Sequence, residues 1–181
     1  MCSSDLQSTR TIVNEVSGLK QMVDEFSKFA RMPVPVMERQ SLHETINDVV
    51  LLYQGAHRDI EFLVDLDEHL TLIMMDREQI KRVFVNLFDN AIQAMNGKGH
   101  LWVTTRYTAR DGKVVIEVAD EGVGIQTGDQ ENLFLPYFSK KKTGTGLGLA
   151  IVHRIISDHN GRIRAGNHVP TGAVFTIELP V

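Results

Sequence analysis

The sequence predicts an α+β fold, an α/β sandwich of one mixed, largely antiparallel sheet covered on one face by about three helices. Two observations predict it. Apolar residues recur at helical spacing in several segments. Between and after them lie short segments rich in β-branched and aromatic residues, bounded by Gly, Asn and Asp.

Composition bounds the function before any motif is considered. The chain has 181 residues, is 43% hydrophobic and 23% charged, and so suits one soluble domain plus an appendage. Its net charge of -4 gives no support to a basic nucleic-acid surface. The single cysteine, Cys2, excludes an intramolecular disulfide, and no Cys/His cluster has zinc-site spacing. No apolar run reaches transmembrane length, so we expect this piece to be soluble.

The N-terminal part is predicted to be a polar tail over residues 1–10 and a helix over 11–32. A heptad-like stripe suits this helix to packing against another helix: Ile12, Val16, Leu19, Val23, Phe26 and Ala30. The alternative is a helix folded back on its own domain. Pro33 and Pro35 cannot continue a helix. We therefore place a linker at 33–40 and a second domain at 41–181.

The first half of that domain begins with a helix over 42–54, opened by a capping box from Ser41 to Glu44. Alternating residues predict a strand over 60–66, with 70–74 as its hairpin partner. Asp76 is placed to cap a long helix, and Gln79 to reach back to that cap. Its predicted apolar face is Ile80, Val83, Phe84, Leu87, Ala91 and Met95. Residues 96–99, Asn-Gly-Lys-Gly, stop it.

The second half is predicted to contain two strands over 101–107 and 113–119, joined by a turn at 110–112. A Gly- and Lys-rich stretch over 120–145 has little periodicity. A helix over 146–159 and two final strands, over 162–165 and 173–179, complete the domain.

A first polar patch lies on the long helix. Asn86, Asn90 and Gln93 are spaced by four and three residues, so they share one face beside the apolar one. An amide oxygen is a neutral hard ligand, suited to a magnesium ion that keeps most of its water. The alternative is a row of solvent-facing amides.

A second patch, Asp120-Glu-Gly122-Val-Gly124, follows a predicted strand. A carboxylate at a strand end can accept a hydrogen bond from an exocyclic amine. Glycines let the backbone approach a flat ring because they lack a Cβ. The alternative is a plain strand-ending turn.

A third patch, Gly144-Thr-Gly-Leu-Gly148, opens a helix and would present backbone N–H groups to a phosphate. It lacks the Gly-Lys-Ser/Thr ending of a P-loop and the third glycine of a dinucleotide fingerprint. Lysines 140–142 precede it, and one could neutralise a polyphosphate, although a charge run is usually a solvated face. Apolar residues at 134–138 indicate a lid.

The order and spacing of these patches resemble the histidine-kinase ATPase domain, which has the Bergerat fold. Asn86–Met95 resembles its N box, Asp120–Gly124 its G1 box, Leu133–Phe138 its F box and Gly144–Leu149 its G2 box. Residues 172–180 resemble its terminal strand. The resemblance covers residues 41–181.

The resemblance implies ATP and Mg²⁺ as ligands. Asn90 would coordinate magnesium, with Asn86 assisting. Asp120 would bind the adenine amino group, with Gly124 beside the ring, and Thr176 would reach adenine through a water. Many relatives have a basic residue where this chain has Gln93, which shifts the expected phosphate contact to Lys141. The implied nucleotide-binding residues are Asn86, Asn90, Gln93, Ala94, Asp120, Gly122, Gly124, Ile125, Phe138, Lys141, Gly144, Thr145, Gly146, Leu147, Gly148, Leu149 and Thr176, with Asn86, Asn90 and Lys141 as catalytic residues and Asn90 as the metal ligand.

Position 86 narrows the implied reaction. In hydrolytic relatives of this fold, such as gyrase, the matching site holds a glutamate that acts as general base for water. An amide has no comparable basicity, so Asn86 cannot do that. The resemblance therefore implies transfer to a protein histidine, with catalysis by positioning and electrostatics.

The N-terminal helix extends the resemblance. Residues 18–31 resemble the second helix of a kinase dimerisation hairpin. The sequence Phe-Ser-Lys-Phe-Ala-Arg at 26–31, followed by Pro33 and Pro35, resembles nitrogen-regulation sensor kinases. The first hairpin helix should carry His-Glu-x-x-Asn-Pro, and none of the seven histidines has that context. We therefore expect a cytoplasmic donor fragment whose parent kinase can be anchored in the bacterial inner membrane. The implied partners are a hairpin with the acceptor histidine, a response regulator receiver domain, and a second copy through residues 12–30.

Two other functions fit the same sequence. One is an interaction module that dimerises through residues 12–30 and regulates another kinase without binding nucleotide. The other is a serine or threonine kinase of the anti-sigma type, which uses the same fold. Nucleotide affinity tests the first alternative, and the acid stability of the phosphorylated product tests the second.

Overall fold

A computed structural model of the chain describes residues 13, 16–18, 20, 23, 27, 31–70, 72–138 and 145–181. From residue 38 onward its elements are β1 (Glu38–Ser41), α2 (Leu42–Ala56), β2 (Ile60–Asp65), β3 (Leu72–Met75), α3 (Arg77–Ala94), β4 (Gly99–Thr108), β5 (Lys113–Asp120), α4 (Gly148–Asp158), β6 (Arg162–Asn167) and β7 (Ala173–Pro180).

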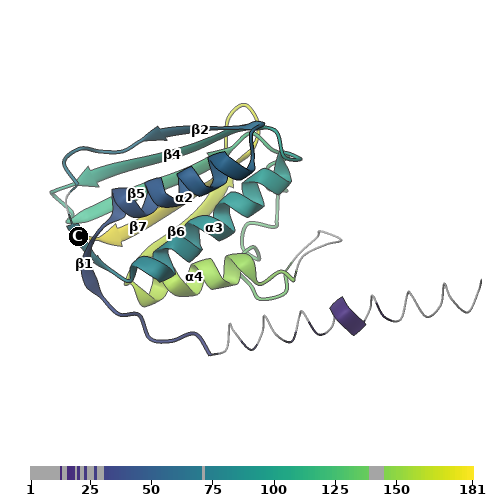
Figure 1. Ribbon diagram of the computed structural model, residues 1–181, viewed down its shortest axis with the longest axis horizontal. Helices are drawn as coiled ribbons and strands as arrows, with labels where there is room; N and C mark the ends of the chain where they lie inside the picture. The colour runs from purple at the N-terminus through teal and green to yellow at the C-terminus, as the bar shows by residue number, and fades with distance from the viewer. Residues whose placement is uncertain are drawn as a thin grey trace, which may run out of the picture.

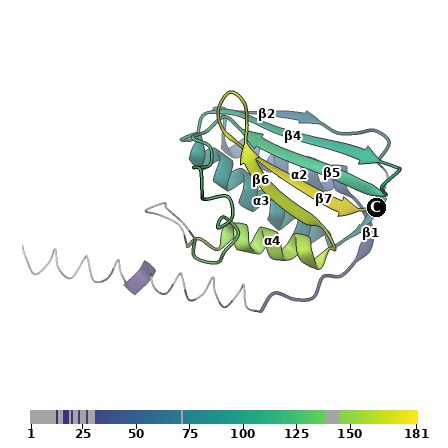
Figure 2. The same cartoon turned by 180° about the vertical axis from the view of Figure 1, so that it is seen from behind.

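The main sheet has the strand order β2-β4-β5-β7-β6 among the described residues. Only the β2–β4 pair is parallel in this sheet, and its other pairs are antiparallel. Helices α2, α3 and α4 lie side by side over one face (Figure 1), and the view from behind shows the opposite face without a helix on it (Figure 2). The predicted sandwich of a mixed, largely antiparallel sheet under helices is confirmed.

The core lies between the helices and the covered face of the sheet, where burial of apolar surface stabilises the fold. Every residue predicted for the apolar face of α3 is buried: Ile80, Val83, Phe84, Leu87, Ala91 and Met95. In β5 and β7, alternate side chains such as Val118 and Phe175 point into this core. The strand period therefore leaves Glu117 and Thr176, which are paired in the register, on the uncovered face.

The predicted hairpin between residues 60–66 and 70–74 is wrong. Strand β3 pairs antiparallel with β1, with Glu38 opposite Met75, in a separate two-stranded sheet. Strand β2 instead pairs parallel with β4. Strand β1 lies mostly within the segment predicted as a linker, so the ordered domain begins before residue 41.

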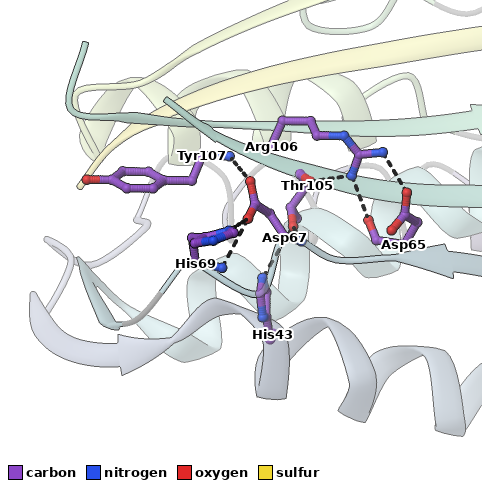
Figure 3. Close-up of polar contacts among 7 residues, drawn as sticks. All are labelled: His43, Asp65, Asp67, His69, Thr105, Arg106 and Tyr107. Atoms are coloured by element: carbon purple, nitrogen blue, oxygen red, sulfur yellow. Dashed lines mark hydrogen bonds and ion pairs between the residues drawn. The ribbon is translucent and has the colours of Figure 1, made fainter. Parts of the chain in front are cut away.

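Asp67 joins the loop after β2 to β4 (Figure 3). The backbone N–H of Asp67 donates to the Thr105 hydroxyl at 2.9 Å, and the Tyr107 N–H donates to the Asp67 carboxylate at 2.8 Å. The second carboxylate oxygen accepts from the His69 N–H at 3.0 Å. These bonds hold the loop after β2 onto β4, and the next strand, β3, pairs with β1.

We expect Asp67→Asn to lower the urea midpoint of unfolding at neutral pH. The Tyr107 N–H, followed by the His69 N–H and ring, lowers the pKa of Asp67 from 3.8 to about 2. A lowered folded-state pKa stabilises the fold above the unfolded-state pKa, and that stabilisation is lost as pH falls through the folded-state value. The difference between wild type and variant should therefore shrink as pH falls from 3.8 toward about 2. Glu68→Gln, an exposed neighbour, is the control. A pH-independent difference would contradict the assignment.

The N-caps of α2 and α3 form as predicted, but the Gln79 side chain has a different partner. The Ser41 hydroxyl accepts from the Glu44 N–H, and Asp76 accepts from the Gln79 N–H at 3.0 Å, as predicted. The Gln79 side chain does not reach back to the cap. Its amide donates to the carbonyl of Pro33 at 3.1 Å, because the segment before β1 runs past the start of α3.

The predicted hairpin helix is described only in part. Residues 13, 16–18, 20, 23 and 27 are helical, and the stripe positions Val16 and Val23 are exposed. The other stripe residues and the predicted tail at 1–10 lie outside the described residues. The partner of this helix stays a prediction. In the described part of the chain, no helix has both the length and the apolar character that crossing a membrane requires.

Candidate nucleotide-binding site

Helix α3 brings the predicted motifs together. The turn formed by Asp120–Ile125, hereafter the 120–125 turn, lies on the C-terminal end of α3: a Cβ at Gly122 would stand 2.7 Å from Ala94. The start of α4 lies against the middle of α3, since a Cβ at Gly148 would stand 2.9 Å from Asn86 Oδ1. The G1-like and G2-like segments therefore meet on the stretch of α3 that carries the N-box-like amides.

The amides of α3 have different surroundings. Asn86 is half-buried, and its Nδ2 donates to the carbonyl of Arg82 at 2.7 Å, which turns Oδ1 toward Gly148. Asn90, one turn further, is also half-buried, whereas Gln93 is exposed. Between them, Asp89 accepts a hydrogen bond from the Tyr53 hydroxyl of α2 at 2.6 Å. This bond fixes the rotation of α3 relative to α2.

Asp120 is a buried carboxylate at the end of β5, with 3% of its surface exposed. Its Oδ1 accepts from the Gly122 N–H at 2.8 Å and from the Ala173 N–H at 3.2 Å. Hydrogen bonds from backbone donors offset the cost of burying a charge. The carboxylate is therefore held in one orientation by its own turn and by β7.

The loop between β6 and β7 clamps the 120–125 turn. Asn167 Oδ1 accepts from the Ile125 N–H at 2.7 Å, and Asn167 Nδ2 donates to the Ile125 carbonyl at 3.0 Å. A Cβ at Gly124, which has φ +71°, would stand 3.0 Å from both Asn167 and Gly172. A Cβ at Gly172, which has φ +110°, would overlap the carbonyl oxygen of Asp120. Sequence reasoning missed both Asn167 and Gly172.

The start of α4 is joined to the F-box-like segment. The Tyr137 N–H donates to the Gly146 carbonyl at 3.0 Å, and a Cβ at Gly146 would stand 2.7 Å from the Tyr137 backbone. The Phe134 ring contacts His153 of α4, with centroids 5.6 Å apart. Among the described residues, no side chain caps α4, and no acidic residue occupies its first turn. Its first N–H groups and the positive end of its dipole suit an anion.

The remaining predicted residues near α4 divide between core and surface. Leu147 is fully buried and Leu149 packs against the core, so their side chains support the helix while their backbone forms its start. Phe138 and Thr145, which flank residues 139–144, are half-buried. Lys141 and Gly144 lie outside the described residues, and their roles stay predictions.

The structure does not bring Thr176 to Asp120, so the predicted adenine contact of Thr176 is wrong. The Thr176 hydroxyl lies beside the Glu117 carboxylate at 3.4 Å, on the uncovered face of the sheet. Asp120 belongs to the opposite face, with Val118. The β7 residue that meets Asp120 is Ala173, through its backbone.

A known family matches the part of the chain that carries these features. The family described as histidine kinase-, DNA gyrase B-, and HSP90-like ATPase matches residues 75–181, and the chain belongs to it. The chain therefore contains a domain of an ATPase family. Curated relatives include the signal transduction histidine-protein kinase AtoS of Escherichia coli, 33% identical over 94% of this chain, and the nitrogen regulation protein NtrY of Azorhizobium caulinodans, 34% identical over 96%. The chain spans 28% of AtoS and 23% of NtrY.

Solved histidine kinases share the fold. The catalytic domain of histidine kinase ThkA, 34% identical, matches with a TM-score of 0.73 over 80% of this chain and 95% of that domain. ThkA in complex with the response regulator protein TrrA, 29% identical, matches with a TM-score of 0.78 over 99% of this chain and 52% of ThkA. These relatives place the chain among sensor histidine kinases.

Proposed function

We propose that this domain transfers the γ-phosphate of Mg·ATP to a histidine on a dimerisation hairpin, for onward transfer to a response regulator. The observation that carries the proposal is the placement of Asn86. Its amide lies against the start of α4, where phosphates would bind, and donates to the Arg82 carbonyl. A neutral amide cannot take a proton from water, so the position favours transfer over hydrolysis.

The described residues fit ATP as the substrate. The buried Asp120 carboxylate would accept a hydrogen bond from the adenine amine, and the backbone at Gly124 would lie beside the ring. The start of α4, which no described side chain caps, would bind phosphate oxygens through N–H groups. Ala94, Gly122 and Ile125 would shape the adenine side, since Gly122 packs on Ala94 and Ile125 is held by Asn167.

Magnesium would arrive with the nucleotide. Within the described residues, no group of three His, Cys, Asp or Glu side chains could hold a metal ion. An ion between the phosphates needs only one or two protein ligands and keeps several waters. Asn90, with Asn86 one turn earlier, would supply them, and Lys141 would contact the terminal phosphate.

The hairpin and its histidine belong to the proposal as well. Residues 11–32 would form the second hairpin helix, residues 33–40 the connection, and residues 41–181 the catalytic domain. The helix would pair with a second copy through residues 12–30, and a hairpin outside this chain would supply the acceptor histidine.

Asn90→Ala is expected to abolish phosphorylation of a hairpin supplied in trans. The chain is incubated with γ-labelled Mg·ATP and a separate hairpin of a related sensor kinase that carries the acceptor histidine. Loss of a metal ligand should lower the labelling rate by about 100-fold or more, because charge stabilisation by the metal is lost. Asn47→Ala, an exposed amide on α2, is the matched control.

The chemistry of the product separates the alternatives. Acid-labile, base-stable label on the hairpin supports histidine transfer, and acid-stable label would indicate a serine or threonine kinase. Phosphate release without labelled hairpin would indicate hydrolysis. Absence of any Mg·ATP affinity would leave the interaction module as the function.

A further inference from the structure

His100 joins the edge of the sheet to the 120–125 turn. Its Nδ1 lies 3.1 Å from Glu121 Oε2, and its Nε2 lies 3.2 Å from Glu61 Oε2 on β2. The His100 backbone N–H also donates to Glu121 Oε1 at 3.1 Å. Glu121 therefore holds both the ring and the backbone of His100, and it stands between Asp120 and Gly122 in the turn.

The geometry requires a charged imidazole. Ionised carboxylates only accept hydrogen bonds, and each ring nitrogen of His100 faces one. Both nitrogens can donate only in the imidazolium form. The hydrogen bond and charge of Glu121, followed by the charge of Glu61, raise the pKa of His100 above its ordinary value. These are the charged groups that face the ring, from the turn and from β2.

The place of Glu121 is built by the backbone beneath it. A Cβ at Gly99, where φ is +137°, would stand 2.5 Å from Glu121 Oε1, so a side chain there would displace this carboxylate from its place. The Glu121 carbonyl is close to the Thr171 hydroxyl at 3.5 Å, on the β6–β7 side. The side chain of Glu121 thus contacts β4, and its backbone lies near the β6–β7 loop.

A row of rings continues from His100 to that loop. The His100 ring lies 5.7 Å from Trp102, and Trp102 lies 5.0 Å from His168. The His168 N–H donates to the Gly172 carbonyl at 2.9 Å. Gly172 is the residue that packs on the Asp120 backbone. The row of rings therefore runs across the uncovered face from His100, which holds Glu121, to the β6–β7 loop, whose Gly172 packs on Asp120.

We propose that His100 is a positioning residue for the nucleotide: its imidazolium, bridging Glu61 and Glu121, holds the 120–125 turn in the shape that binds adenine. The inference rests on the proposed function. A raised folded-state pKa stabilises the folded form below the unfolded-state pKa, and that stabilisation is lost as pH rises through the folded-state pKa. The bridge between Glu61 and Glu121 therefore opens on the alkaline side. Mg·ATP then binds more weakly.

The test compares Mg·ATP dissociation constants of wild type and His100→Gln by calorimetry from about pH 6 to about pH 8.5. The ratio of the two constants cancels the titration of ATP itself. We expect the variant to bind about threefold more weakly at the acid end, as suits partly exposed ion pairs, and equally at the alkaline end. Glu121→Gln should remove the same pH dependence while keeping an acceptor for the His100 N–H.

The single tryptophan supplies a readout without nucleotide, because a protonated imidazole quenches a neighbouring indole more than a neutral one. Because His168 is a second imidazole beside Trp102, the comparison is made in a His168→Gln background. There, Trp102 emission should rise with pH when His100 is kept, also with His69→Gln added, an exposed histidine paired with Asp67. It should not rise with His100→Gln added. A dissociation-constant ratio independent of pH overturns the proposal alone. Failure of wild type to bind Mg·ATP at any pH overturns it together with the proposed function.

Discussion

Asp120→Asn is expected to weaken Mg·ATP binding by about 10- to 100-fold, the worth of a hydrogen bond to a charged group. The Gly122 and Ala173 N–H groups require an acceptor at Oδ1, so the asparagine oxygen must stay there. The new NH₂ then occupies the other oxygen's position. The NH₂ and the adenine amine are both donors, so no hydrogen bond forms between them. The Mg·ATP affinity measured by calorimetry should therefore fall.

The same argument predicts a change of base preference. Inosine carries a carbonyl where adenosine carries the amine, and a carbonyl can accept from the asparagine NH₂. Mg·ITP should therefore gain affinity relative to Mg·ATP in Asp120→Asn. Glu117→Gln, a carboxylate on the uncovered face of the same strand, should bind both nucleotides as wild type does. Equal losses for both nucleotides in Asp120→Asn would instead indicate a collapsed turn.

Gly172→Ala is expected to lower the free energy of unfolding by about 3 kcal/mol or more, since a strained φ and a steric overlap add. The new Cβ would overlap the carbonyl oxygen of Asp120, and φ at this position is +110°. The β6–β7 loop must move away from the turn to admit it. Loss of Mg·ATP affinity should accompany the loss of stability, because the 120–125 turn loses its contact with the β6–β7 loop.

Gly166→Ala is the matched control for this substitution. Gly166 lies in β6 in the same part of the fold, and the nearest atom to its added Cβ would be Val174 Cγ1 at an ordinary 3.8 Å. Its free energy of unfolding, obtained from the urea midpoint, should change by no more than about 0.5 kcal/mol. Similar midpoints for the two variants would contradict the packing described for Gly172.

Local sequence patterns predicted the covered side of the domain. The apolar face of α3 follows from a 3.6-residue period, and the caps at Ser41 and Asp76 follow from side chains that bond N–H groups three residues on. The motif order also predicted that Asn86, Asp120 and Gly148 belong to one site. Each signal lies within a few residues, so it can be read without knowing the fold.

Strand partners could not be read in this way. Residues 60–66 alternate as a strand and 70–74 were predicted as its partner, but β2 pairs with β4, and Asp67 bonds to Thr105 and Tyr107, about forty residues away. Strand propensity reports a fit to a half-buried surface and does not name the neighbour. The misplaced Thr176 has the same origin, because the register of β7 on β5 decides which side chains share the face of Asp120.

The sequence by itself determined the fold class, the family motifs and the amide at position 86, because periodicity and residue chemistry are local properties. Only the tertiary structure decided how the 120–125 turn is held. Asn167 and His100 carry no local pattern of their own, and the terminal-strand motif that begins at Gly172 does not reveal its contact with Asp120. Their roles arise from hydrogen bonds and close contacts that join distant segments, and these exist only once the sheet has formed its register.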